Sequence, residues 1–97
     1  MSNFSEQINE TLIYVGQKLR TERERLHFTR EYMEQITAVS VDTIKRIESG
    51  KPSSIENVLK IAAALHIPFS LLFPAPPRDK YVIRQEIDTL LDELSKS

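Results

Sequence analysis

Residues 29–48 have the sequence TREYMEQITAVSVDTIKRIE, and this stretch decides the fold of the chain. Thr29 and Ser40 are residue types that cap helix N-termini, because a side-chain hydroxyl can accept a hydrogen bond from a free amide of the first turn. The stretch therefore predicts two short helices, one after each cap, joined by a tight turn at residues 37–39.

The spacing of apolar residues indicates which faces of these two helices are buried. Met33 and Ile36 fall on one face of the first helix, and Ile44 and Ile47 fall on one face of the second. Because a helix turns by about 100° per residue, the second helix directs a set of polar residues outward: Asp42, Lys45, Arg46 and Ser49. This layout is that of a helix-turn-helix whose second helix could enter a DNA major groove. Two amphipathic helices packed in a small bundle with a solvated outer face would have the same periodicity.

Three longer segments carry a resemblance to a known family. Residues 16–29 (GQKLRTERERLHFT), 39–51 (VSVDTIKRIESGK) and 56–73 (ENVLKIAAALHIPFSLLF) resemble the phage repressor and Cro family of helix-turn-helix domains, also called XRE-type. The resemblance covers roughly residues 15–73. It implies an all-α fold, a five-helix lambda-repressor-like bundle with a long first helix, to which the sequence adds an extra C-terminal helix.

The chain departs from the family pattern where the two short helices meet. Ala38 stands where glycine is usual, which predicts either a mildly strained turn or a slightly different one. Glu34 stands where the family usually has a small alanine, and Thr37 where a small apolar residue is usual. A carboxylate buried at this contact would need a partner. The crossing of the two helices and the register of any DNA contacts depend on how these side chains fit.

Helix signals in the rest of the chain extend this arrangement in both directions. We expect a long first helix over residues 5–25, with its buried stripe formed by Ile8, Leu12, Val15, Leu19 and Leu26. Gly50 should end the second of the short helices. Ser53 with Glu56 should form a capping box for a fourth helix, and Pro68 should open a short fifth one.

The predicted organisation is an N-terminal extension of the first helix (residues 1–14), a helix-turn-helix domain (15–73), a proline-rich linker (74–78) and a C-terminal helix (79–97). Four apolar residues of the last helix recur at intervals of four, three and four: Ile83, Ile87, Leu90 and Leu94. They would form a homodimer seam together with the N-terminal end of the first helix. Alternatively, this stripe would fold back onto the core of its own chain.

The composition limits the classes to which the protein can belong. Its 97 residues, of which 40% are hydrophobic, suffice for one small helical domain. The absence of cysteine excludes disulfides and cysteine-based metal sites. Since neither a signal peptide nor a stretch of membrane-spanning length is evident, we expect a soluble, cytoplasmic protein without a membrane partner.

The formal net charge of −1 argues against indiscriminate binding to nucleic acid, so the distribution of charge matters. Residues 15–60 carry nine basic and seven acidic side chains, whereas residues 1–14 carry two acidic ones and no basic one. The small positive excess coincides with the helix-turn-helix segment, although a solvated face of mixed charge would explain it almost as well. We therefore expect modest DNA affinity per subunit and a need for dimerisation.

Residue roles follow from the resemblance combined with the chemistry of each side chain. Arg30, just after the first cap, corresponds to a common phosphate contact. Arg46 is the best candidate for base readout, since its outward fork fits the O6 and N7 of guanine. Val41 could pack on a thymine methyl group, and Asp42 could accept from a cytosine amino group or simply stabilise the helix dipole. The remaining predicted DNA contacts are Ser40, Thr43, Lys45 and Lys51.

The resemblance assigns a structural role to Arg23 and Glu48. In the family the matching arginine and glutamate form a largely buried ion pair that fixes the recognition helix on its scaffold. Removing one partner would leave a buried charge unpaired and should destabilise the fold.

No catalytic constellation is evident, and the sequence implies no cofactor. His27 and His66 are isolated, without a cysteine or a glycine-rich phosphate loop beside them, so we expect neither an enzyme nor a metal site.

The leading expectation is a sequence-specific regulator that binds double-stranded DNA, a dimeric repressor of an inverted-repeat operator. The alternatives are a restriction-modification controller or antitoxin of the same fold, and a protein-interaction module with weak DNA binding whose partner contacts the terminal helices.

Overall fold

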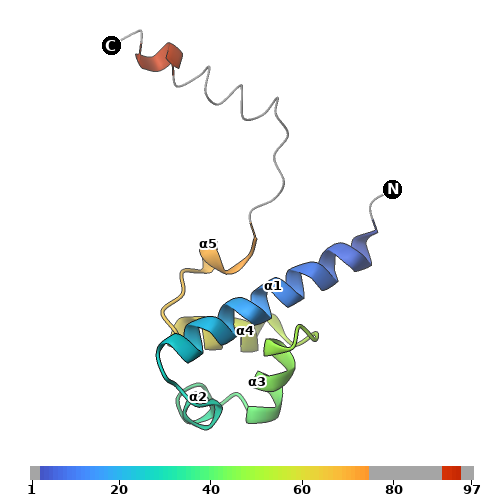
Figure 1. The fold of residues 1–97 in the computed structure, drawn as a ribbon, viewed down its shortest axis with the longest axis vertical. Coiled ribbons are helices and arrows are strands. Elements are labelled where there is room, and N and C mark those ends of the chain that lie inside the picture. Colours follow the sequence, from blue (N-terminus) through green and yellow to red (C-terminus); the bar gives the residue numbers. More distant parts are fainter. Residues whose placement is uncertain (1–2, 75–90, 95–97) are drawn as a thin grey trace.

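The computed structural model describes residues 3–74 and 91–94 (Figure 1). Its helices are α1 (Phe4–Arg25), α2 (Arg30–Thr37), α3 (Val41–Glu48), α4 (Ile55–Ala64) and α5 (Phe69–Leu72). A further helical turn covers residues 91–94, and no strand occurs among the described residues. The fold is therefore all-α, as predicted.

Side-chain caps determine where the short helices begin. Thr29 Oγ1 accepts a hydrogen bond from the Tyr32 amide at 3.0 Å, and Ser40 Oγ accepts one from the Thr43 amide at 3.1 Å. Both predicted caps are confirmed. The capping box predicted for Ser53 is wrong, because α4 begins one residue later and Ser54 accepts from the amide of Asn57 at 3.2 Å.

The turn between α2 and α3 is of the strained kind. Ala38 has φ 63° and ψ 14°, the left-handed conformation that glycine adopts more easily. Thr37 compensates the local backbone, since its hydroxyl donates to the Met33 carbonyl at 2.6 Å and accepts from the Val39 amide at 3.1 Å. The polar residue that replaces a small apolar one in the family pattern therefore has both partners within the turn.

The core lies among the helices, with α1 packed against α3, and α2 packed against both α3 and α4. Its buried members come from every helix and from the connections between them: Val15, Leu19, Met33, Val39, Ile44, Ile47, Val58, Ile61, Ala62, Leu65, Ile67 and Leu72. Leu26 packs against this cluster and is partly buried. Two predicted core residues, Ile36 at 47% and Ile8 at 58%, are exposed, and Leu12 is half-buried and is not among the residues that pack against the cluster.

The two exposed residues lie near helix ends. Met33 is the one buried residue of the eight in α2, and Ile36 in its last turn is exposed. Helix α1 begins well before the elements that it packs against, and its first turns extend past them (Figure 1). Residues 3–10 are all exposed, and Leu12 is half-buried.

Gly16 allows α1 to pass directly against the C-terminal end of α3. A Cβ atom on this residue would clash with the carbonyl oxygen of Ile47 and lie 3.0 Å from that of Glu48. The absence of a side chain therefore sets the distance between the two helices. This contact fixes the end of α3 on its scaffold.

The structure tests little of the predicted C-terminal arrangement. Residues 75–78 of the linker lie outside the described residues, as do Ile83, Ile87 and Leu90 of the predicted dimer seam. Leu94 is described and is exposed. Dimerisation through this segment stays a prediction.

Candidate nucleic-acid interface

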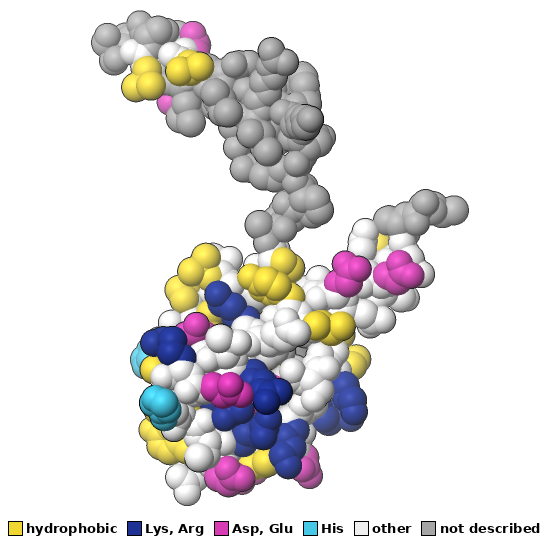
Figure 2. Space-filling model, in the orientation of Figure 1, with side chains coloured by type: hydrophobic (Ala, Val, Ile, Leu, Met, Phe, Trp, Pro, Cys, Tyr) yellow, Lys and Arg dark blue, Asp and Glu magenta, His cyan; other side chains and the backbone are white. Residues whose placement is uncertain are grey.

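The outer face of α3 is polar and exposed, whereas its inner face is part of the core. Ile44 and Ile47 are buried, and Asp42, Lys45 and Arg46 are exposed. Figure 2 shows basic side chains gathered over α3 and the adjoining part of α1, with acidic side chains among them. Helix α3 thus has the shape and polarity of a groove-binding element.

The N-terminus of α3 is held by two side chains. Ser40 Oγ caps it and also donates to Thr43 Oγ1 at 2.9 Å, while Thr43 and Val41 are half-buried. The Val41 amide donates to Glu34 Oε2 at 3.0 Å. The Glu34 carboxylate is therefore not buried at the contact between the two helices: its side chain is exposed and accepts from the first amide of α3. Together with Asp42, it makes this end of α3 acidic.

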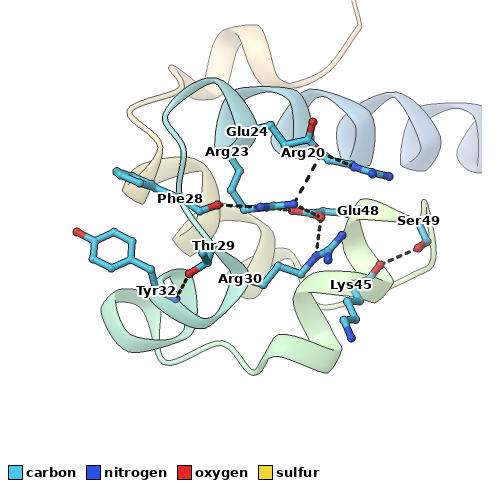
Figure 3. Close-up of polar contacts among 10 residues, drawn as sticks. All are labelled: Arg20, Arg23, Glu24, Phe28, Thr29, Arg30, Tyr32, Lys45, Glu48 and Ser49. Carbon is cyan, nitrogen blue, oxygen red and sulfur yellow. Dashed lines mark hydrogen bonds and ion pairs between the residues drawn. The ribbon is translucent and has the colours of Figure 1, made fainter.

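The C-terminus of α3 is anchored by a buried ion pair (Figure 3). Arg23 Nε lies 2.7 Å from Glu48 Oε2, and Arg23 Nη2 lies 3.1 Å from Glu48 Oε1. The third nitrogen of Arg23, Nη1, donates to the Phe28 carbonyl at 2.8 Å. Each of the paired residues is 8% exposed. A bidentate pair in this setting orients α3 against α1.

Comparison with known families agrees with this arrangement. A helix-turn-helix family model matches residues 19–72, more than half of the chain. The chain belongs to the XRE, Cro/C1-type family of helix-turn-helix proteins. This is a family of DNA-binding regulators that are generally not enzymes. Comparison of the chain with curated proteins and with solved structures gave no significant match.

In this XRE-type chain Arg30 makes a contact that the sequence did not suggest. Its Nε donates to Glu48 Oε1 at 3.0 Å, and its side chain is 30% exposed. The two residues are 18 positions apart, so neither periodicity nor a local motif could have revealed the contact. The predicted phosphate contact of Arg30 stays a prediction, now with a defined side-chain position.

A second arginine pair lies on the surface of α1. Arg20 Nε donates to Glu24 Oε1 at 2.7 Å, and both side chains are exposed. This hydrogen bond holds the pKa of Glu24 below its usual value and raises the pKa of Arg20. The pair resembles the Arg30–Glu48 contact in its atoms but has no buried member.

Lys51 follows α3 directly and is exposed. Its amide donates to the Arg46 carbonyl at 3.0 Å, and Gly50 adopts φ 81° to make this turn. At the same end of the helix, Ser49 Oγ donates to the Lys45 carbonyl at 2.8 Å. Lys51 therefore extends the series of basic side chains that begins with Lys45 and Arg46.

Within residues 3–74 and 91–94, no cluster of three or more potential metal-ligating side chains occurs. In the same part of the chain, no helix is long and apolar enough to cross a membrane.

Proposed function

We propose that this XRE-type protein is a dimeric transcriptional repressor that binds an inverted-repeat operator with α3 in the major groove of double-stranded DNA. The observation that carries the proposal is the exposed polar face of α3, which a cap, a close helix contact and a buried ion pair hold rigidly on the core. A rigid scaffold lowers the entropy cost of placing several side chains against base edges at once.

The proposed DNA-binding residues divide into those that contact bases and those that contact phosphates. Arg46 contacts guanine, Asp42 accepts from a cytosine amino group, and Val41 packs on a thymine methyl group. Another group of residues contacts phosphates and sets the register of the protein on DNA: Arg30, Ser40, Thr43, Lys45 and Lys51.

Dimerisation follows from the modest charge of one subunit. Nine basic against seven acidic residues over residues 15–60 provide few net phosphate contacts, and a second subunit converts two weak contacts into one strong one. Two recognition helices about 34 Å apart would match one turn of DNA and dictate an inverted repeat. We assign the interface to the C-terminal seam together with the exposed end of α1, where Phe4 and Ile8 present apolar side chains to solvent.

The test is selection of bound sequences from a random duplex pool at two salt concentrations. The Arg46→Ala variant should lose about 1–3 kcal/mol of specific binding and relax one base position. Arg25→Ala is the matched control, since Arg25 is also an exposed arginine but lies on α1, where it pairs with Glu22. Recovery of a palindrome with half-sites one turn apart would support the dimeric repressor. Unchanged binding by Arg46→Ala would contradict the assignment of base readout.

A protein-interaction module is the second candidate. It is favoured by the two carboxylates at the N-terminus of α3, Glu34 and Asp42, which would repel nearby phosphates. Recovery of no sequence above background would favour this candidate. A restriction-modification controller or antitoxin would bind DNA in the same way and would differ in the genes beside its binding site.

A further inference from the structure

Glu48 is the centre of a cluster in which two arginines share one carboxylate (Figure 3). Arg23 occupies both carboxylate oxygens, and Arg30 donates a third hydrogen bond to Oε1. Arg23 also lies 4.0 Å from Glu24, which is itself paired with Arg20, so the three arginines and two glutamates around this site retain one positive charge. That surplus belongs to Arg30, because its side chain is 30% exposed whereas those of Arg23 and Glu48 are at most 9% exposed.

The contact between Arg30 and Glu48 leaves most of the guanidinium available. Arg30 uses Nε alone, and no residue in the described parts of the chain accepts a hydrogen bond from its two Nη groups. A planar guanidinium binds phosphate through paired N–H groups. A side chain that is already held by one edge loses less conformational entropy when its other edge binds.

The Arg20–Glu24 pair shows why the buried carboxylate matters. Arg20 also donates through Nε, at 2.7 Å, but its acceptor is an exposed side chain on the same helix. Such a pair is weakly fixed and is screened by salt. Glu48, by contrast, is held by two hydrogen bonds from Arg23, independently of its contact with Arg30.

We infer that Glu48 is a positioning residue for DNA binding: it holds Arg30 so that the Nη groups face a DNA phosphate. The inference rests on the proposed DNA-binding function and adds to it a residue that does not itself touch DNA. A phosphate bound at Arg30 would neutralise the surplus charge of the cluster and continue an alternating series of phosphate, Arg30, Glu48 and Arg23. The buried ion pair thus links the fold to the interface.

A double-mutant cycle measures this dependence. The full chain, Arg30→Gln, Glu48→Gln and the double variant are titrated at several salt concentrations with a synthetic duplex that carries the selected sequence. Arg30→Gln should weaken binding about ten- to a hundredfold, as for loss of a charge-assisted hydrogen bond, and reduce the salt slope by about 0.9. In the Glu48→Gln background the same change should cost less than about threefold, because Arg30 is no longer held. Arg25→Gln is the control, because Arg25 pairs with Glu22 and not with Glu48, and it should cost the same in both backgrounds.

A measurement on the unmodified chain keeps the inference testable if Glu48→Gln does not fold. Side-chain NMR should show that the Arg30 Nε–H exchanges with solvent more slowly than that of Arg46, whose guanidinium has no partner among the described residues. Adding the duplex should shift the Arg30 Nη signals and leave the Nε–H protected. Loss of that protection on binding would overturn the inference, because Arg30 would have to leave Glu48 to reach DNA.

The other outcomes separate the inference from the function on which it rests. Additive costs of the two substitutions, or tighter binding by Glu48→Gln, would overturn the positioning role while leaving DNA binding intact. Failure of the unmodified chain to bind any selected duplex would refute the proposed function and the inference with it.

Discussion

Replacing Glu48 with leucine should destabilise the fold by about 3–5 kcal/mol, because it leaves a buried guanidinium without its counter-charge. Arg23 is 8% exposed and donates two of its three hydrogen bonds to Glu48. The bond from Nη1 to the Phe28 carbonyl would remain, together with a 4.0 Å ion pair to the exposed carboxylate of Glu24. Domains of this size are stable by roughly 5–15 kcal/mol in total, so the loss is a large fraction and should be visible in any unfolding experiment.

The double replacement Arg23→Met with Glu48→Leu should recover most of this loss, because no buried charge remains. We expect it to lie within about 2 kcal/mol of the parent, with about 1 kcal/mol attributable to the lost bond to Phe28. Arg30 can turn to water, since it is partly exposed. Urea unfolding followed by helical circular dichroism would measure the free energy of unfolding of the parent, Glu48→Leu, the double variant and a control. Glu56→Gln, which breaks the exposed pair with Lys60, is the control and should cost less than about 0.5 kcal/mol.

Two results would refute this reasoning. A Glu48→Leu variant within about 1 kcal/mol of the parent would mean that the pair is solvated in practice and does not behave as a buried one. A double variant no more stable than Glu48→Leu would mean that packing rather than charge sets the cost. The free energies of unfolding should therefore be compared at equal slopes of the urea dependence, so that changes in the unfolded state do not mimic either result.

Three smaller predictions concern single positions. Gly16→Ala should destabilise the fold by about 1–3 kcal/mol, because its Cβ would push α1 away from the Ile47 carbonyl; an unchanged melting temperature would contradict the close contact. Ala38→Gly should stabilise the fold by about 1 kcal/mol in urea unfolding, since φ is 63° there, and the absence of a gain would mean that the turn is not strained. Glu24→Gln should lower the melting temperature at neutral pH and have no effect in acid. The hydrogen bond from Arg20 depresses the folded-state pKa of Glu24 below 4.5, so its contribution is present above that pH and is lost as the pH falls through the lowered value.

Local signals in the sequence predicted the helix starts well. The caps at Thr29 and Ser40 depend on an amide three residues away, and the short helices follow from them. The error at α4 is of the same local kind. Ser53 and Ser54 are both competent caps, and the path of the preceding loop decides between them, which the sequence does not show.

Burial at the edges of the helices was harder to predict, because periodicity identifies a face but not how far its partner extends. Ile36 and Ile8 lie on the predicted apolar faces and are nevertheless exposed, and the first turns of α1 extend past the helices that α1 packs against (Figure 1). The place of the Glu34 side chain stayed open for a related reason. The sequence shows that a longer side chain replaces an alanine of the family pattern, but not that this side chain lies outside the contact and accepts from the Val41 amide.

Within the candidate interface, the resemblance supplied the pairing of Arg23 with Glu48 but not the third member of the cluster. From the sequence, Arg30 is a candidate DNA contact alone, because its position beside a helix N-terminus suggests a phosphate contact. Its bond to Glu48 joins the start of α2 to the end of α3. A contact between two helix ends depends on how the helices cross, which neither helix specifies by itself.

The two arginines that bind Glu48 differ in how many of their nitrogens are engaged. All three guanidinium nitrogens of Arg23 donate to protein acceptors and none is left for a ligand, whereas Arg30 donates through Nε alone. A phosphate bound by Arg30 would therefore be tied, through Glu48, to α1 as well as to α3, rather than to a flexible side chain. Net charge is then a poor guide to the binding capacity of this surface. A chain with a formal charge of −1 can present a cationic face when its acidic residues are used to hold its basic ones in place.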